Sequence, residues 1–182
     1  MMSVTENPEQ TLIKDCLRGD RMAQRKLYEL YSGKMMAICM RYCKDKETAK
    51  DLLHDGFIKV YTHLDSFKGA GSFEGWIRRI MVNTALEYLR KQNDEGFQVD
   101  IDEAKTLTGY DMGGLEAMQT EALIQSIQQL PDVYRTTFNL FVVEGYSHKE
   151  IAEAMNITES SSRVYLTRAR QMLQTILKND RF

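Results

Sequence analysis

Apolar side chains recur at steps of three and four residues along most of the first half of the chain. This spacing places them on one face of an α-helix, because 3.6 residues complete a turn. The pattern predicts several packed helices, two of which span about 47–64 and about 73–91. The residues expected to face inward are Leu12, Cys16, Leu17, Leu27, Leu30, Tyr31, Met35, Ile38, Cys39, Tyr42, Leu52, Leu53, Phe57, Val60, Tyr61, Leu64, Trp76, Ile77, Ile80, Ala85 and Leu89.

A segment without helical periodicity then divides the chain, and four glycines within it interrupt any helix. Between 94 and 121, eight acidic residues face a single basic one, a net charge of −7. Such a composition is typical of a linker. We expect a flexible acidic linker at 93–114, which joins one small helical domain at 1–92 to another at 115–182.

Periodicity returns at Leu115 and predicts a helix that continues to Leu130. Pro131 follows, and proline is well suited to the first position of a helix. The next helix is expected to begin there and to end at Gly145, because glycine commonly terminates helices.

The segment after Gly145 has the pattern of a helix-turn-helix. Ser147 and Glu150 form a capping box, in which each side chain can bond to the backbone amide of the other. Asn156 suits a left-handed turn, and Thr158 can cap the helix that follows. The order of helix, short turn and helix is that of many DNA-binding proteins. The inward face of the second helix is expected to hold Ser162, Tyr165 or Leu166, Ala169, Leu173 and Ile176.

The composition agrees with an all-α protein, since the chain has only two prolines and its periodic segments are rich in good helix formers. No apolar run approaches the roughly 18 to 20 residues of a membrane span, and the first residues do not resemble an export signal. We therefore expect a cytoplasmic protein. The three cysteines, Cys16, Cys39 and Cys43, are expected to be reduced thiols.

A formal net charge of −2 would oppose DNA binding if it were spread evenly. The charge is segregated instead. Between 158 and 182, five basic residues face two acidic ones, a net charge of +3. This asymmetry indicates that a basic module follows the acidic linker.

Three groups of residues resemble those of the sigma-70 family, extracytoplasmic-function group, and the resemblance covers nearly the full length of the chain. The residues similar to sigma region 2 are Ala23, Leu27, Tyr28, Tyr31 and the run Lys50–Tyr61. Those similar to its promoter-melting part are Phe67–Gly69 and the run from Phe73 to Arg90. Those similar to sigma region 4 are Leu130–Arg135, Gly145–Ala152 and Arg168–Arg170.

The resemblance implies two small helical domains, region 2 and region 4, and an alternative sigma factor that gives RNA polymerase its promoter specificity. It implies core RNA polymerase as a partner, through the β′ clamp helices and the β flap, promoter DNA, and an anti-sigma factor that is often membrane-bound in the family. The residues expected to bind the core enzyme are Asp51, Leu52, Asp55 and Lys59.

The resemblance also implies that the loop after Phe67 and the following helix recognise the minus-10 element as melted DNA. Backbone amides and short side chains suit a pocket for an unstacked base, and arginines can neutralise phosphates. Core packing is the preferred interpretation of Trp76, because it lies at helical spacing with Ile77 and Ile80. The residues expected at the minus-10 element are Lys68, Gly69, Ala70, Gly71, Ser72, Arg78, Arg79 and Asn83.

The second helix of the helix-turn-helix is expected to meet the minus-35 element. Ser162 replaces the valine of many family members and Tyr165 replaces a basic residue, so the base-reading side chains stay open. Arg168 and Arg170 can contact phosphate or form salt bridges between helices. The residues expected near the minus-35 DNA are Thr158, Ser160, Ser161, Arg163, Thr167, Arg168 and Arg170.

Other function classes find little support. No metalloprotease or nucleophile-elbow motif is present, so we expect no enzyme, no catalytic residue, no cofactor and no small-molecule substrate. Cys39 and Cys43 could share a helical face and hold zinc, but two buried thiols are favoured over a metal site. The alternative function is a helix-turn-helix regulator, or a decoy that sequesters an anti-sigma factor, acting without polymerase.

Overall fold

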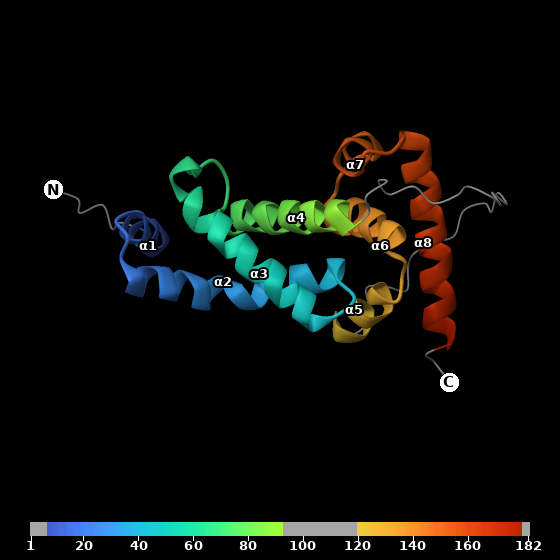
Figure 1. Cartoon of the computed structure of the whole chain (residues 1–182), viewed down its shortest axis with the longest axis horizontal. Helices are drawn as coiled ribbons and strands as arrows, with labels where there is room; N and C mark the ends of the chain where they lie inside the picture. Colours follow the sequence, from blue (N-terminus) through green and yellow to red (C-terminus); the bar gives the residue numbers. More distant parts are fainter. Residues whose placement is uncertain (1–6, 93–119, 180–182) are drawn as a thin grey trace. The chain divides into compact units, whose positions relative to one another are not determined.

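The computed structural model describes residues 7–92 and 120–179, and the expected linker at 93–114 lies outside them. All regular structure in these two ranges is helical, as the sequence predicts (Figure 1). No helix of the described ranges combines the length and apolar character that a membrane span requires. The elements in chain order are α1 (Pro8–Leu17), α2 (Arg21–Tyr42), α3 (Lys46–Thr62), the 3-10 turn η1 (Leu64–Ser66), α4 (Phe73–Gln92), α5 (Thr120–Gln128), α6 (Asp132–Phe138), the π-helical turn η2 (Asn139–Val143), α7 (His148–Met155) and α8 (Glu159–Asn179).

The chain divides into two compact units. Of the described residues, the first unit holds 7–39 and 47–85, and the second holds 40–46, 86–92 and 120–179. Each unit has its own apolar core, so each is described by itself below.

The first unit is held together by apolar faces of α2, α3 and α4. Leu27 on α2, Val60 on α3 and Ile77 on α4 are completely buried. Aromatic rings fill the spaces between these aliphatic side chains: the rings of Tyr28 and Phe57 lie 4.7 Å apart, in the range of favourable tilted packing. Most residues predicted to face inward are indeed buried or half-buried.

Two predicted core residues of the first unit, Leu17 and Leu30, are exposed, and those predictions are wrong. Leu17 is the last residue of α1, and the chain turns away after it at Gly19, which has a φ of 82°. Leu30 follows the buried Leu27 by three residues, which sets it back by about 60° around the helix. The buried stripe of α2 continues instead at Met35, so the side chain of Leu30 is left uncovered.

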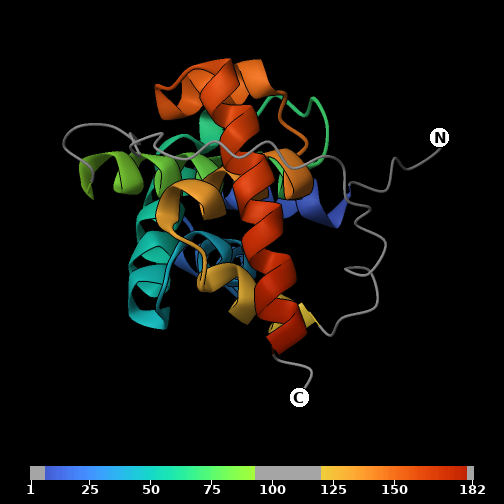
Figure 2. The same ribbon diagram turned by 90° about the vertical axis from the view of Figure 1, so that its right-hand side faces the viewer.

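In the second unit, the long helix α8 packs against α5, α6 and α7 (Figure 2). The sequence predicted Pro131 as the first residue of the helix, but Pro131 directly precedes α6. The next helix does not run uninterrupted to Gly145, because α6 passes into the π-helical turn η2 at Asn139. Gly145 then takes a φ of 75°, a left-handed conformation that favours glycine and ends the element. This turn sets the starting point of the helix-turn-helix.

Candidate nucleic-acid interface

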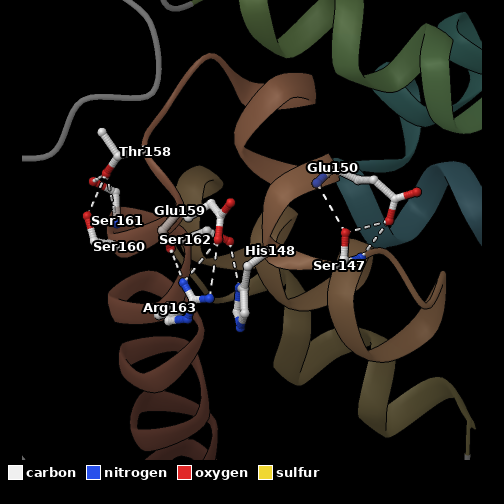
Figure 3. Close-up of polar contacts among 9 residues, drawn as sticks. All are labelled: Ser147, His148, Glu150, Thr158, Glu159, Ser160, Ser161, Ser162 and Arg163. Carbon is white, nitrogen blue, oxygen red and sulfur yellow. Dashed lines mark hydrogen bonds and ion pairs between the residues drawn. The ribbon is translucent and has the colours of Figure 1, made fainter.

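The helix-turn-helix begins with the capping box that the sequence predicts (Figure 3). The backbone amide of Ser147 donates to the Glu150 carboxylate over 2.8 Å, and the amide of Glu150 donates to the Ser147 hydroxyl over 3.3 Å. The Ser147 hydroxyl also donates to the same carboxylate oxygen, Oε2, over 2.7 Å. These bonds favour the ionised carboxylate, so they lower the pKa of Glu150. The start of α7 is therefore fixed by two residues.

The turn between α7 and α8 depends on Asn156 and Thr158. Asn156 has a φ of 55° and is the only non-glycine residue with positive φ in the described ranges. Asparagine tolerates this left-handed conformation better than most residues. Thr158 accepts a hydrogen bond at Oγ1 from the amide of Ser161 over 3.1 Å, which caps the first turn of α8. Both features of the turn agree with the sequence prediction.

The inward face of α8 is composed largely as predicted. Tyr165 and Leu166, between which the pattern could not decide, are both buried, and the ring of Tyr165 lies 5.8 Å from that of Tyr134. Ser162 is completely buried, whereas Ile176 is only half-buried. Ser162 and Tyr165, the two residues that differ from the usual sigma-70 pattern, are both buried, so neither presents its side chain to solvent.

The outward face of α8 carries small polar and basic side chains. Ser160, Arg163 and Thr167 are exposed, and Ser161 is half-buried. Near the start of α8, the Arg163 guanidinium pairs with the Glu159 carboxylate over 3.2 Å. Both groups are exposed, so the contact is weak. This outward face therefore has the size and polarity that suit a DNA groove.

The two arginines further along α8 contact the unit itself. The guanidinium of Arg168 lies 3.5 Å from the Tyr134 hydroxyl, and that of Arg170 lies over the Phe141 ring, 6.0 Å from its centroid. Both side chains are half-buried. Helix packing is thus one role of Arg168 and Arg170, alongside the phosphate contacts predicted for them.

The predicted minus-10 loop, Lys68–Ser72, is exposed along its whole length. Gly69 and Gly71 have φ angles of 75° and 88°, so two of its five residues adopt a conformation that favours glycine. Ser72 accepts a hydrogen bond from the Gly75 amide over 3.0 Å, as expected of a helix cap. Lys68 donates from Nζ to the Asp65 carbonyl over 3.2 Å. The loop is thus anchored at both ends and open between them.

An aromatic cluster of Phe67, Phe73 and Trp76 flanks this loop in the sequence. The rings of Phe73 and Trp76 are stacked with centroids 5.6 Å apart, and Phe67 lies 5.0 Å from Phe73. Trp76 is half-buried in this cluster, which bears out the packing role predicted for it. Further along α4, Arg79 and Asn83 are exposed. Arg78, the remaining predicted residue of this group, is half-buried.

The predicted core-binding residues of α3 do not all share one face. Asp51 and Asp55 are exposed and lie one turn apart, whereas Leu52 is buried in the first unit and Lys59 is half-buried. Ile58, which the sequence analysis did not single out, is 62% exposed and follows Asp55 by three residues. Asp51, Asp55 and Ile58 thus form one outward strip, the α3 face. The sequence feature that could have indicated this strip is an apolar residue, Ile58, at helical spacing from Asp51 and Asp55.

The described residues contain no group of three or more side chains suited to bind a metal ion. Cys16, Cys39 and Cys43 are buried free thiols. Burial raises the pKa of Cys39 to about 12, which keeps the thiol protonated and unreactive at neutral pH.

An all-α fold with a capped C-terminal helix-turn-helix and a second exposed, glycine-containing loop is typical of the DNA-binding class of proteins. Comparison with known proteins identifies the family. The sigma-70 region 2 family matches residues 27–95, and the sigma-70 region 4 family matches residues 120–173. The chain therefore belongs to the sigma-70 family, in its extracytoplasmic-function (ECF) group.

Curated relatives are similar along the whole chain. The RNA polymerase sigma-H factor of Pseudomonas aeruginosa is 30% identical over 186 residues, with 96% of each chain covered. The ECF RNA polymerase sigma-E factor of Haemophilus influenzae is 30% identical over 178 residues and covers 91% of this chain and 93% of its own. The protein is an alternative sigma factor that binds core RNA polymerase and promoter DNA and directs transcription initiation.

Solved structures share the fold at lower identity. CnrH in complex with the cytosolic domain of CnrY has a TM-score of 0.50 and 18% identity, with 96% of this chain and 99% of that chain covered. The sigma factor RpoE of Bartonella quintana, in complex with the anti-sigma factor NepR, has a TM-score of 0.51 and 20% identity, with coverages of 85% and 96%.

Proposed function

We propose that the two DNA-binding regions of this sigma factor recognise different promoter elements. Residues 1–92 bind the core enzyme and melt the minus-10 element, residues 115–182 read the minus-35 element, and 93–114 link them. The observation that carries this proposal is the pair of exposed polar surfaces, the Lys68–Ser72 loop and the outward face of α8.

The minus-10 surface consists of the Lys68–Ser72 loop with Arg78, Arg79 and Asn83. The loop suits single-stranded DNA because it offers backbone amides and short side chains without bulky groups that would exclude a base. Asn83 can donate and accept hydrogen bonds at a base edge, and the arginines can attract phosphates. An unstacked base would lie against the loop that the Phe73 and Trp76 cluster flanks.

The minus-35 surface is the outward face of α8 together with its capping residue. Ser160, Ser161 and Thr167 can hydrogen-bond to base edges or phosphates, because hydroxyl groups both donate and accept. Arg163 can read guanine or bind phosphate once it leaves Glu159. Thr158, Arg168 and Arg170 would contact the backbone at the margins of this surface.

The α3 face is the proposed contact for the β′ clamp helices, and region 4 the proposed contact for the β flap. An exposed isoleucine beside two carboxylates suits a helix-on-helix interface with an apolar centre and charged edges. Leu52 would act from within, by packing α3 in place, and Lys59 lies at the edge of the strip.

We further propose that an anti-sigma factor holds this protein inactive, by analogy with the related folds that bind NepR and the cytosolic domain of CnrY. That inhibitor could be anchored in a membrane, while the sigma factor itself would act in the cytoplasm beside the polymerase. The chain would supply recognition and DNA melting, and the polymerase would supply all of the catalysis.

Run-off transcription with purified core polymerase tests the proposal. The core enzyme with this protein should initiate at a genomic promoter selected by the holoenzyme, and the core alone should not. Changing Asp51 and Asp55 to lysine should weaken core binding while duplex binding by the full chain stays the same. A core enzyme that initiates equally well without the protein would contradict the proposal and favour a decoy or a stand-alone regulator.

A further inference from the structure

One polar contact inside the helix-turn-helix has no part in the function proposed above. His148, the first residue of α7, lies with its ring nitrogen Nδ1 2.9 Å from the Ser162 hydroxyl of α8 (Figure 3). Ser162 is completely buried and His148 is half-buried. A polar pair at this depth is costly unless its hydrogen bond forms, so the contact constrains both helices.

The imidazole of His148 is held from a second direction. Its ring stacks on Phe141 of η2, with centroids 4.6 Å apart and planes inclined by 25°. The Arg170 guanidinium also lies over the Phe141 ring, 6.0 Å from its centroid. The preceding residue, Ser147, is fixed by the capping box. The ring therefore has little freedom to turn away from Ser162.

Ser162 lies in α8 between residues whose side chains belong to the proposed minus-35 surface. It follows Ser161 and precedes Arg163, and both are residues of the proposed minus-35 surface. A shift or rotation of α8 at Ser162 would therefore move both side chains relative to a base edge. A valine at this position would pack by buried area alone, whereas a hydrogen bond also fixes direction.

We infer that His148 is a positioning residue for promoter recognition, which acts through Ser162 to set the depth and angle of the first turn of α8 in the DNA groove. This inference rests on the proposed minus-35 role of α8. His148 itself contacts no base. The bond sets where Ser160, Ser161 and Arg163 meet the duplex. Its loss should therefore reduce sequence specificity more than it reduces the overall affinity for DNA.

Burial and the neighbouring arginines favour the neutral form of His148. Burial lowers the pKa of the imidazole, and the nearby Arg163 and Arg170 lower it further, whereas Glu159 acts in the opposite direction. A neutral imidazole has one donor nitrogen and one acceptor nitrogen, so it can pair with a hydroxyl in either sense. The pairing with Ser162 is therefore available at neutral pH.

The test uses the holoenzyme and a promoter library whose upstream element is randomised while the minus-10 element is constant. The transcripts are sequenced, and the preference at each upstream position is measured for the wild type and five variants. His148→Phe keeps the stacking ring but removes the hydrogen bond, and Ser162→Ala removes the hydroxyl. The third variant combines both changes. His148→Asn keeps a polar atom at the δ position. Thr175→Ala, a further variant of an exposed hydroxyl on α8, is the matched control.

His148→Phe, Ser162→Ala and the double variant should each lose upstream discrimination by about the same three- to tenfold, the effect of one hydrogen bond. His148→Asn should recover part of it, and Thr175→Ala should match the wild type. Initiation from library members without a favoured upstream element should not change. Additive losses in the double variant, or an equal fall for every library member, would overturn the positioning role. A wild type without any upstream preference would instead overturn the proposed minus-35 function.

Discussion

Gly56 of α3 lies directly against the side chain of Met81 in α4, and a β-carbon at Gly56 would overlap the Met81 sulfur. Met81 is completely buried, so its side chain would have to shift within the packed core to admit a β-carbon at Gly56. The glycine leaves the space that the Met81 side chain occupies, although glycine weakens a helix interior. The contact joins α3 to α4 within the first unit.

Gly56→Ala should lower the free energy of unfolding by about 1–3 kcal/mol, because an overpacked core costs more than the gain in helix propensity. Gly33→Ala in α2 is the matched control, since nothing lies within 4 Å of a β-carbon there. The control should raise stability by about 0.5–1 kcal/mol. Urea unfolding followed by circular dichroism measures both. Equal effects at the two glycines would show that Met81 yields without cost.

Arg135 stabilises the second unit through carbonyl groups at the end of α5. Its Nη1 donates to the carbonyl of Leu130 over 2.8 Å and to that of Gln128 over 3.2 Å, and Nη2 pairs with Asp132. The side chain is 1% exposed. Arg135→Met keeps much of the apolar stem but leaves buried carbonyl groups without donors.

This substitution should lower the free energy of unfolding by about 2–4 kcal/mol, since several charge-assisted hydrogen bonds are lost together. Arg25→Met on α2 is the control, because the ion pair of Arg25 with Glu29 is exposed to solvent and contributes little to stability. Thermal unfolding should separate the two variants clearly. A similar small change in both would mean that water replaces the guanidinium at these carbonyls.

Local signals in the sequence were sufficient for the helix-turn-helix. The capping box of Ser147 and Glu150, the left-handed Asn156 and the cap at Thr158 each involve residues at most three positions apart. Such features depend on the backbone of one short segment, so the sequence alone predicts them. The all-α class followed in the same way from periodicity.

Contacts between distant elements could not be predicted. Periodicity marks a face of one helix, but it does not say which residue of another helix meets that face. The pattern placed Ser162 inside without indicating His148 as its partner. It marked Leu30 as buried, although the described residues leave its side chain exposed. It placed Leu52 inside correctly, and it was the family resemblance that added Leu52 to the core-binding residues.

The capping box makes the stability of α7 dependent on pH. The pKa of Glu150 is lowered in the folded protein, chiefly by the bond from the Ser147 amide. The ionised carboxylate therefore contributes fully to folding stability at a pH above 4.5, the ordinary pKa of glutamate. This contribution is lost as the pH falls through the lowered pKa of the folded state. Glu150→Gln should remove this part of the pH dependence, as measured by unfolding between neutral pH and about pH 3.

Ser147→Ala should cost about 1 kcal/mol at neutral pH, the usual value of a helix cap. It should also weaken the acid dependence in part, because the bond from the Ser147 hydroxyl to Glu150 is lost while the bond from the backbone amide remains. Glu153→Gln, an exposed carboxylate on the same helix, is the control. If Glu150→Gln and Glu153→Gln have the same acid profile, the box does not stabilise α7.

Ile58 offers a sharp test of the α3 face, because its side chain is 62% exposed and supports no core. Ile58→Ala should leave the free energy of unfolding equal or slightly higher, since alanine is the better helix former. It should weaken binding to core polymerase by about tenfold if the isoleucine is buried at the centre of that interface. Met22→Ala in the same unit, at a residue that is 71% exposed, is the matched control and should bind as the wild type does. Titration of labelled protein with core enzyme measures both affinities. An unchanged affinity for Ile58→Ala, or an equal loss for Met22→Ala, would contradict the assignment of the α3 face.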